Sequence, residues 1–291
     1  MLSLVLPKGS LETATLALFE AADLGVHRGS ARDYHASIDD PRIDRVRFLR
    51  PQEIPRYVEE GLFDLGITGQ DWVAETESDV VGMGELAYSK ATGEPVRVVL
   101  AVPQAATWHT VEDLPDGVRI STEFPSLTRR FLADRGVKAT VVPSYGATEA
   151  KVPDIVDAIV DLTETGSSLR KNGLRILDTL LTSYTQLVAN RAAYDDLAKR
   201  AAMQDVALLL QGAIRARGSV LLKVNVSDDQ LAAVLALLPA MSSPNVTALA
   251  DPRMHGVESV VPKRGVNTLI PTLRAAGARD ILELPISKII D

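Results

Sequence analysis

Cysteine is absent from the 291-residue chain, and histidine is rare, with four residues. A chain without cysteine forms no disulfide, carries no thiolate nucleophile and offers no thiolate ligand to a metal. The histidines His27, His35, His109 and His255 show no spacing typical of metal ligands. The sequence therefore gives no indication of a structural zinc site.

Positive charge is also scarce: 31 Lys and Arg stand against 38 Asp and Glu, for a net charge of −7. General affinity for nucleic acids comes from clustered Lys and Arg side chains. A chain with net negative charge is therefore a poor candidate for general nucleic-acid binding. A compact anionic ligand needs only a local group of cations. No window approaches the roughly 18 apolar residues of a membrane span, and the first residues do not resemble a signal peptide. We expect a cytoplasmic protein that binds neither membranes nor nucleic acid.

The order of apolar runs predicts an α/β protein of two or three domains, at about 100–150 residues each. Runs rich in Val, Leu and Ile alternate with helical patterns, which is typical of βαβ units. The predicted strands cover residues 2–6, 46–49, 64–68, 96–102, 119–122, 139–143, 158–162 and 186–190. Residues 88–95 interrupt this pattern with Gly and Pro, and residues 180–191 lead back to a strand. This order suggests two lobes, the second inserted into the first.

The last third of the chain follows a different pattern. After a helix predicted over residues 192–216, the order is strand, helix, two strands, helix and strand, which is the ferredoxin-like βαββαβ arrangement. These elements are predicted at residues 219–226, 228–238, 245–250, 257–262, 266–276 and 280–286. Each helix repeats apolar residues at offsets of three, four and seven, so one face of each should cover a four-stranded antiparallel sheet.

The segment DAIVDLTETGSSL, residues 157–169, is the strongest candidate for a binding site. An apolar strand leads into a small turn that opens a short helix, where unpaired backbone N–H groups can bind a phosphate. Gly166 permits close approach of a ligand because it has no Cβ. The hydroxyl donors in this turn are Thr163, Thr165, Ser167 and Ser168.

Asp157 and Asp161 have the even spacing that places both on one side of a strand. There they can accept hydrogen bonds from sugar hydroxyls or hold a divalent cation through water. The same residue types also form an ordinary helix N-cap beside solvated acids. The pattern of residues alone leaves both interpretations open.

Residues 157–169 resemble the loop that binds phosphoribosyl pyrophosphate (PRPP) in the ATP phosphoribosyltransferase family. LPKGSL at residues 6–11 resembles the Lys-Gly motif of the same family, and LRPQEIPRYV at 49–58 with DLGITGQD at 64–71 is similar to its most recognisable block. Residues 241–249 and 261–271 resemble the C-terminal regulatory domain of the long-form enzymes. These segments occur in the family's order across nearly the whole chain.

The resemblance implies a fold of two α/β lobes of periplasmic-binding-protein-like type and a C-terminal ferredoxin-like (ACT-like) βαββαβ domain. It also implies a reaction in which N1 of the adenine of ATP displaces pyrophosphate from C1 of PRPP, with Mg²⁺ required. The product, phosphoribosyl-ATP, begins histidine biosynthesis. Because positive charge develops on the sugar and negative charge on the leaving group, this chemistry needs cations at the pyrophosphate more than a strong base.

The family's functional residues can be carried over onto matching positions. The implied PRPP-binding residues are Asp157, Asp161, Thr163, Glu164, Thr165, Gly166, Ser167 and Ser168. The implied ATP-binding residues are Lys8, Gly9, Arg50 and Asp71. Lys8, Arg32 and Arg50 are the implied catalytic residues, since ammonium and guanidinium groups bind phosphate oxygens. Glu149 is implied to orient the ribose.

Each of these positions also has an ordinary structural explanation. Lys8 can be an exposed turn lysine, Arg32 and Arg50 can form surface ion pairs, and Asp71 can be a helix N-cap. The sequence identifies neither the Mg²⁺ ligands nor the contacts of an effector.

The resemblance also implies an organisation and a set of partners. Residues 1–90 with 184–212 would form the first catalytic lobe, 91–183 the second lobe with the PRPP loop, and 213–291 a histidine-binding regulatory domain. The implied partners are ATP, PRPP, histidine as an allosteric inhibitor, and further copies of the chain in a dimer or a less active hexamer. Asn245 and Lys223 differ from residues found in relatives, so the histidine contacts are left unassigned.

Two other function classes share this layout: bilobal solute-binding proteins and the ligand-sensing domains of transcription regulators. The lack of an export signal argues against the first, and the lack of a basic helix-turn-helix segment argues against the second. A catalytically silent homologue is a third alternative, against which the presence of Lys8, Arg50 and the loop at 161–168 argues.

Overall fold

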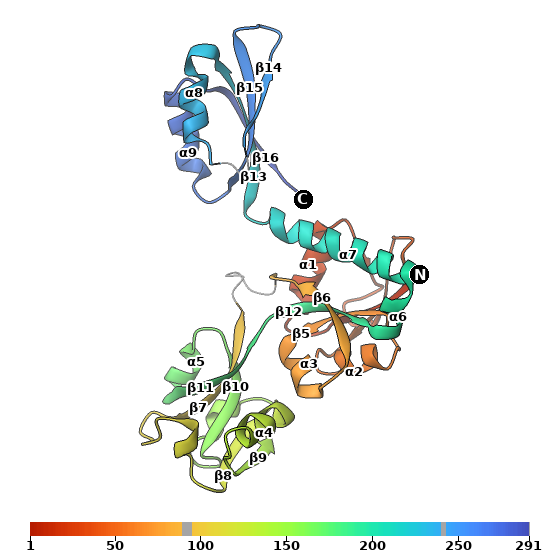
Figure 1. Cartoon of the computed structure of the whole chain (residues 1–291), viewed down its shortest axis with the longest axis vertical. Coiled ribbons are helices and arrows are strands. Elements are labelled where there is room, and N and C mark those ends of the chain that lie inside the picture. Colours follow the sequence, from red (N-terminus) through yellow and green to blue (C-terminus); the bar gives the residue numbers. More distant parts are fainter. Residues whose placement is uncertain (89–94, 240–242, 291) are drawn as a thin grey trace. The chain divides into compact units, whose positions relative to one another are not determined.

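The computed structural model describes residues 1–88, 95–239 and 243–290, and it comprises two compact units, Met1–Ala207 and Leu208–Asp291 (Figure 1). The first unit contains two β-sheets and the second contains one. Most of the predicted interruption at 88–95 and the first two residues of the segment 241–249 lie outside the described residues.

The larger sheet of the first unit has the strand order β2-β3-β4-β1-β5-β12-β6. Its strands are β1 (Leu2–Pro7), β2 (Val26–His27), β3 (His35–Ile38), β4 (Ile43–Leu49), β5 (Leu65–Gly69), β6 (Val80–Glu85) and β12 (Thr185–Asn190). β1 runs parallel to both β4 and β5, whereas β3 and β12 are antiparallel to their neighbours. Consequently β1, β4 and β5 end at the same edge of the sheet.

Helices cover this sheet, which explains why β1, β5 and β12 are buried along nearly their whole length, whereas charged residues alternate with apolar ones in β4. Val5, Phe48 and Ile67 are completely buried in the three parallel strands. The helices of this part are α1 (Glu12–Ala21), α2 (Ile54–Glu59), α3 (Gln70–Thr76) and α6 (Arg191–Asp195).

The second sheet has the order β11-β7-β10-β8-β9. Its strands are β7 (Val96–Pro103), β8 (Val118–Thr122), β9 (Ala139–Pro143), β10 (Ala158–Thr163) and β11 (Leu174–Ser183). β8 is parallel to β9 and β10, and β7 is antiparallel to β10 and β11. Successive residues of β7 pack into separate cores on the two faces, which include Val98 and Val99 respectively. The associated helices are α4 (Pro125–Ala133), α5 (Ser167–Lys171) and the 3₁₀ turns η1 (Val111–Asp113) and η2 (Thr148–Lys151).

The second sheet is inserted into the first along the sequence, because β7 to β11 all fall between β6 and β12. On the return path Tyr184 alone separates β11 from β12. Two α/β lobes are therefore confirmed as the architecture of the first unit.

The second unit is an antiparallel sheet of order β14-β15-β13-β16 with two helices on one face. Its elements are β13 (Ser219–Ser227), α8 (Asp228–Leu237), β14 (Asn245–Ala248), β15 (Met254–Pro262), α9 (Val266–Ala275) and β16 (Arg279–Pro285). Val224 of the sheet packs with Val234 of α8 and Leu273 of α9 in one core. The predicted βαββαβ order and its two apolar helix faces are confirmed.

The helix predicted over residues 192–216 is wrong in one respect, because it is interrupted. It comprises α6 and α7 (Leu197–Ala216), separated by Asp196 in extended conformation. The Asp196 carboxylate accepts the amides of Ala198 and Lys199, so it begins a new helix rather than continuing the old one. None of the described helices, the 20-residue α7 included, is long and apolar enough to cross a membrane.

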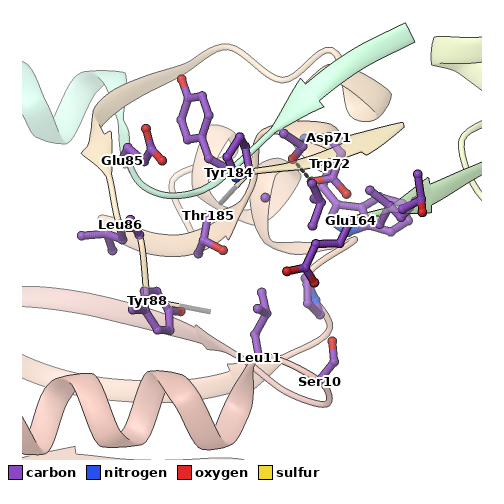
Figure 2. Close-up of a pocket in the computed structure, with 18 residues that line it drawn as sticks. Ser10, Leu11, Asp71, Trp72, Glu85, Leu86, Tyr88, Glu164, Tyr184 and Thr185 are labelled. Atoms are coloured by element: carbon purple, nitrogen blue, oxygen red, sulfur yellow. Dashed lines mark hydrogen bonds between the residues drawn. The ribbon is translucent and has the colours of Figure 1, made fainter. Parts of the chain in front are cut away.

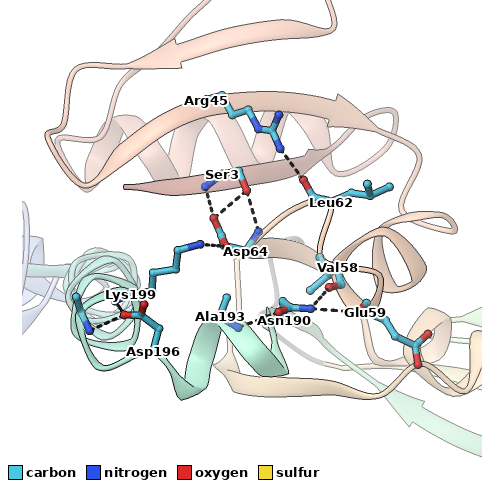
Figure 3. A network of polar contacts seen from close by, with 11 residues as sticks. Ser3, Arg45, Val58, Glu59, Leu62, Asp64, Asn190, Ala193, Asp196 and Lys199 are labelled. Atoms are coloured by element: carbon cyan, nitrogen blue, oxygen red, sulfur yellow. Dashed lines mark hydrogen bonds and ion pairs between the residues drawn. The ribbon is translucent and has the colours of Figure 1, made fainter.

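A polar network joins β1, β5 and α7 at the edge opposite the strand ends (Figure 3). The carboxylate of Asp64, just before β5, accepts the amide and the hydroxyl of Ser3 at 2.8 and 2.9 Å. Lys199 of α7 lies 2.7 Å from the same carboxylate. Burial alone would raise the pKa of Asp64, but the hydrogen bonds from Lys199 and Ser3 outweigh it and hold the pKa below its ordinary value.

Replacing Asp64 by Ala should lower the free energy of unfolding at pH 7 by about 1–3 kcal/mol, because hydrogen bonds to a charged acceptor are lost. Since the pKa is lower in the folded state, this contribution is present above the unfolded pKa of about 4 and is lost as pH falls through the folded value. Urea unfolding at pH 7 and pH 3 measures both effects. The exposed Asp39→Ala is the matched control. The account would be contradicted if Asp64→Ala and wild type differed in free energy of unfolding by the same amount at pH 3 as at pH 7.

Candidate active site

Lys8, Gly9 and Arg50 come together at one edge of the seven-stranded sheet. Lys8 follows β1 and Arg50 follows β4, and these parallel strands end in register, with Pro7 paired to Leu49. The Lys8 amide donates to the Leu49 carbonyl over 2.7 Å. Gly9 has a φ of +97°, and a Cβ built there would lie 3.7 Å from Nη1 of Arg50. The guanidinium thus lies beside a turn whose backbone conformation favours glycine.

A carboxylate that the sequence did not single out stabilises this turn. Glu12, the first residue of α1, accepts the Gly9 amide at 3.3 Å and pairs with Arg28 at 2.7 Å. Burial acts to raise the pKa of Glu12, but the hydrogen bonds from Arg28 and Gly9 keep it below its ordinary value. The contact with Gly9 is local, because the two residues are three positions apart, whereas the ion pair with Arg28 of the following segment has no signal in the local sequence.

Arg32 does not join the other cations. It lies in the exposed loop between β2 and β3, where its amide donates to the Ser30 hydroxyl at 3.3 Å. Tyr34 of the same loop contacts Lys8, whose Nζ lies 4.2 Å from the ring centroid. The loop therefore borders the Lys8 turn. Within the described part of the chain, the Arg32 guanidinium forms no ion pair with another candidate residue.

Asp71 is buried in the first turn of α3, with 4% of its surface exposed. Its Oδ1 accepts the Ser183 hydroxyl at 2.6 Å, and its amide donates to the Ser183 Oγ at 3.0 Å. Burial raises the pKa of Asp71, and it is opposed by hydrogen bonds to the carboxylate from the Ser183 hydroxyl and from the amides of Asp71 and Trp72. Gly69 is the N-cap of α3, so the interpretation of Asp71 as an N-cap is wrong.

The loop after β10 has the predicted strand–turn–helix form, but its hydroxyl groups act differently from the prediction. Gly166 has a φ of +71° and precedes α5. Its amide donates to the Thr163 Oγ1 at 2.8 Å, and the Ser167 amide donates to the Thr165 Oγ1 at 3.3 Å. These two amides therefore do not point outward unpaired as expected, because a Thr oxygen reaches a nearby amide in a tight turn. Each hydroxyl proton can still be donated to a ligand.

Three acidic residues border this loop. Glu149, in η2, accepts a hydrogen bond from the Ser168 hydroxyl at 2.6 Å, so it lies next to the loop. Asp161 lies on β10 two residues before Thr163. Burial, together with the nearby charges of Glu149 and Glu123, raises the pKa of Asp161 to about 6. The hydrogen bond from the Leu162 amide acts in the opposite direction.

Asp157 does not belong to this group. It precedes β10, whereas the loop follows that strand, and at ~3.3 Å per residue the separation is about 20 Å. Its carboxylate accepts the Arg119 amide of β8 at 2.8 Å. Even spacing placed Asp157 and Asp161 on one side of a strand, but it did not place them at the same end.

A cavity of about 220 Å³ lies where residues from the two lobes meet (Figure 2). Leu11, the N-cap of α1, lines it together with Asp71 and Trp72 of α3. Thr163 at the end of β10 and Glu164 of the following loop line it from the other lobe. The returning segment Ser183 to Thr185 completes the wall. Its lining combines aromatic and apolar surfaces with a few polar groups, which is typical of a small-molecule site.

A second cavity, of about 840 Å³, shares Trp72 with the first. Arg50, Arg56 and Tyr57 line it from one lobe, and Tyr145 lines it from the other. Arg56 received no role in the sequence analysis. These residues add a guanidinium to the region next to Arg50.

Helices α3 and α4 connect the two lobes beside these cavities. The rings of Trp72 and Phe124 lie 4.7 Å apart between centroids. The Glu75 carboxylate accepts the amides of Ser126 and Leu127 at 3.0 and 2.8 Å, and so caps α4 from the other lobe. Sequence reasoning missed Glu75, because a cap from a distant segment leaves no local signal.

This arrangement supports binding of anions and sugars better than nucleophilic catalysis. Cations gather at Lys8 and Arg50, while hydroxyl and carboxylate groups gather at residues 161–168. No three His, Asp or Glu side chains of the described residues are arranged to hold a metal ion by themselves.

Comparison with known proteins shows similarity along the whole chain. The family profile for ATP phosphoribosyltransferase matches residues 50–212, and the profile for the HisG C-terminal domain matches residues 216–288. ATP phosphoribosyltransferase of Pelotomaculum thermopropionicum is 48% identical over 289 residues, which is 99% of each chain. The enzyme of Desulforudis audaxviator is 49% identical over 289 residues, again 99% of each chain.

Among solved structures, a chain of the ATP phosphoribosyl transferase (HisG:HisZ) complex from Thermotoga maritima matches with a TM-score of 0.62 at 29% identity. The match covers 72% of this chain and 97% of that chain.

The Asp161 carboxyl group should titrate with a midpoint near pH 6. Glu149→Gln should lower that midpoint because it removes a neighbouring negative charge, yet leave it above the ordinary value because burial is the larger cause. Carbon-13 NMR of aspartate carboxyl groups, with Asp161→Asn for assignment, measures both values. The exposed Glu112→Gln should leave the midpoint unchanged. A midpoint near 4 in wild type would show that the carboxylate is solvated.

Proposed function

We propose roles for individual residues of this chain. The chain belongs to the ATP phosphoribosyltransferase family. The family's enzymes join ATP to PRPP in the first step of histidine biosynthesis. The proposal rests chiefly on one observation: the loop after β10 and the first turn of α3 line the same cavity. A phosphorylated sugar held by the loop would thereby face a base held beside α3.

The loop residues Thr163, Glu164, Thr165, Gly166, Ser167 and Ser168 bind the 5′-phosphate and ribose of PRPP. The bent backbone at Gly166 allows close approach, and the hydroxyl groups donate to phosphate oxygens. Asp161 and Glu149 accept hydrogen bonds from the ribose hydroxyls. Asp157 has no part in this binding, because it lies at the other end of β10.

ATP is contacted by Lys8, Gly9, Arg50 and Asp71. The phosphate groups are bound by the cations Lys8, Arg32 and Arg50. As the C1–oxygen bond of PRPP breaks, negative charge develops on pyrophosphate, and cations that face it stabilise the transition state. Adenine N1 supplies its own lone pair, so no protein base is required. Arg32 reaches this site if its exposed loop closes over the Lys8 turn.

Mg²⁺ fits the chemistry of this site. It prefers oxygen ligands and commonly binds substrate phosphates with one or two carboxylates. Asp161, Glu149 and Glu123 provide such carboxylates near the loop. Burial is the main cause of the raised pKa of Asp161, and the charges of Glu149 and Glu123 add a smaller repulsion that a cation would relieve. When bound, Mg²⁺ neutralises part of the pyrophosphate charge.

The C-terminal unit is assigned the regulatory role. In this proposal residues 1–90 with 184–212 and residues 91–183 form the catalytic lobes, and residues 213–291 bind histidine and promote a less active hexamer of the dimeric enzyme. Lys223 pairs with Glu258 on the neighbouring strand at 2.7 Å, so its charge is engaged within the sheet. Asn245 begins the exposed strand β14. A cytoplasmic location remains a prediction.

An absorbance assay with ATP, PRPP and Mg²⁺ tests the reaction directly, with pyrophosphatase added to draw the equilibrium forward. Mass spectrometry should identify phosphoribosyl-ATP as the product. A protein that binds both substrates without forming this product would instead be a silent homologue.

Thr165→Val should raise the KM for PRPP about tenfold, because it removes a hydroxyl donor and the acceptor of the Ser167 amide. The KM for ATP should change little. Thr140→Val, at an exposed threonine of β9 in the same lobe, is the control. An equal rise in both KM values would contradict assignment of the loop to PRPP.

A chain that ends at Gly218 keeps the whole of α7 and loses the C-terminal sheet. It should retain measurable catalysis and lose inhibition by histidine. Activity with and without histidine, together with oligomer size by light scattering, provides the measurement. Inhibition that persists in the shortened chain would place the effector site in the first unit.

A further inference from the structure

Ser183 is a buried serine at the junction between the two sheets of the first unit. It ends β11, has 1% of its surface exposed, and is followed by Tyr184 and then β12. Its hydroxyl donates to Asp71 Oδ1 at 2.6 Å and accepts the Asp71 amide at 3.0 Å. A single side chain thus binds both the carboxylate and the backbone of Asp71.

The Asp71 carboxylate depends on this contact. A buried carboxylate is costly unless hydrogen bonds compensate for lost water. Besides the amides of Asp71 and Trp72, the Ser183 hydroxyl is the donor that acts on it. Oδ1 also lies close against Gly69, 2.0 Å from where a Cβ would stand, compared with 3.5 Å for Oδ2. Oδ1 is therefore fixed by its surroundings, which leaves Oδ2 as the oxygen with more room.

The returning segment holds the start of α3 by its backbone as well. The Gln70 amide donates to the Tyr184 carbonyl at 2.9 Å. On the other side, the Leu86 amide donates to the Thr185 carbonyl at 2.8 Å. The orientation of Asp71 is therefore tied to the segment that links the two lobes. Figure 2 shows Asp71, Trp72 and Tyr184 around the same cavity.

We propose that Ser183 is a positioning residue that orients the Asp71 carboxylate. In this orientation Oδ2 of Asp71 accepts a hydrogen bond from the 6-amino group of adenine. The proposal rests on the function assigned above. The 6-amino group adjoins N1, the reacting atom, so this contact would aim N1 at the sugar. A 6-oxo purine presents a carbonyl oxygen at that position, and a carboxylate repels it. A site built to accept a hydrogen bond from an amino group therefore rejects a purine that carries an acceptor there.

Direct binding of ATP and of inosine triphosphate to the full-length protein, measured by calorimetry without PRPP, tests this role. Wild type should prefer ATP. Ser183→Ala should weaken ATP binding about tenfold and leave inosine triphosphate binding unchanged, because only the amino group loses a properly placed acceptor. The buried Ser121→Ala of β8 is the matched control and should leave the preference intact.

The pH dependence of ATP binding gives a second readout. The Ser183 hydroxyl stabilises the ionised carboxylate, so Ser183→Ala should raise the pKa of Asp71 further and move the loss of ATP binding to higher pH. The other carboxylates that line this cavity, Glu85 and Glu164, are unchanged in the variant. If Ser183→Ala does not fold, Ser183→Cys keeps an unbranched side chain with a slightly larger atom and a weaker donor, and it should show the same loss of preference.

The outcomes separate the two claims. Equal weakening of ATP and inosine triphosphate, or an unchanged pH profile, would make Ser183 a structural residue and overturn the inference. Wild-type protein that forms no phosphoribosyl-ATP would overturn the assigned function instead.

Discussion

Parallel pairing of β1 with β4 and β5 is the constraint on which the candidate site depends. Parallel strands that are buried on both faces end at one edge of their sheet, and the residues that follow them must meet there. Lys8 and Arg50 are neighbours for this reason, although 41 positions of sequence separate them and no direct bond joins them. The same rule applies to β8, β9 and β10, so the loop that follows β10 lies at the edge where β8 and β9 also end.

The contact between α3 and α4 gives the two lobes a shared framework. Helix α4 begins at Pro125, and its N-cap, Phe124, has no side-chain oxygen to accept the first amides. Glu75 of the other lobe supplies that acceptor, and a helix cap contributes on the order of 1 kcal/mol. Separation of α3 from α4 would expose two amides and part the rings of Trp72 and Phe124. The cavity beside these helices is therefore bounded by contacts that favour one arrangement.

Local patterns in the sequence were sufficient for the more apolar strands, the C-terminal helices and the form of the loop after β10, because burial imposes a pattern on apolar side chains. They missed the strands β2, β3, β6 and β11. They failed where a polar residue interrupts a regular element. Asp178 and the threonines of β11 interrupt its apolar pattern, so this strand was not predicted. Asp196 ends one helix and begins another where the apolar spacing predicted a continuous helix. They also failed for contacts between distant segments: Ser183 with Asp71 and Glu75 with α4 depend on a tertiary arrangement that no local spacing encodes.

The charge distribution explains how an acidic chain can act on two polyanions. Lys8 and Arg50 lie at the ends of β1 and β4, whereas Asp161 and Glu149 lie at the end of β10. In the proposed arrangement the cations face the departing pyrophosphate, and the carboxylates lie near the ribose that becomes electron-poor. Such a separation of charge favours the transition state over the ground state, because both charges grow only as the bond breaks. A uniformly basic cleft would bind both substrates more tightly but would not stabilise the positive charge on the sugar.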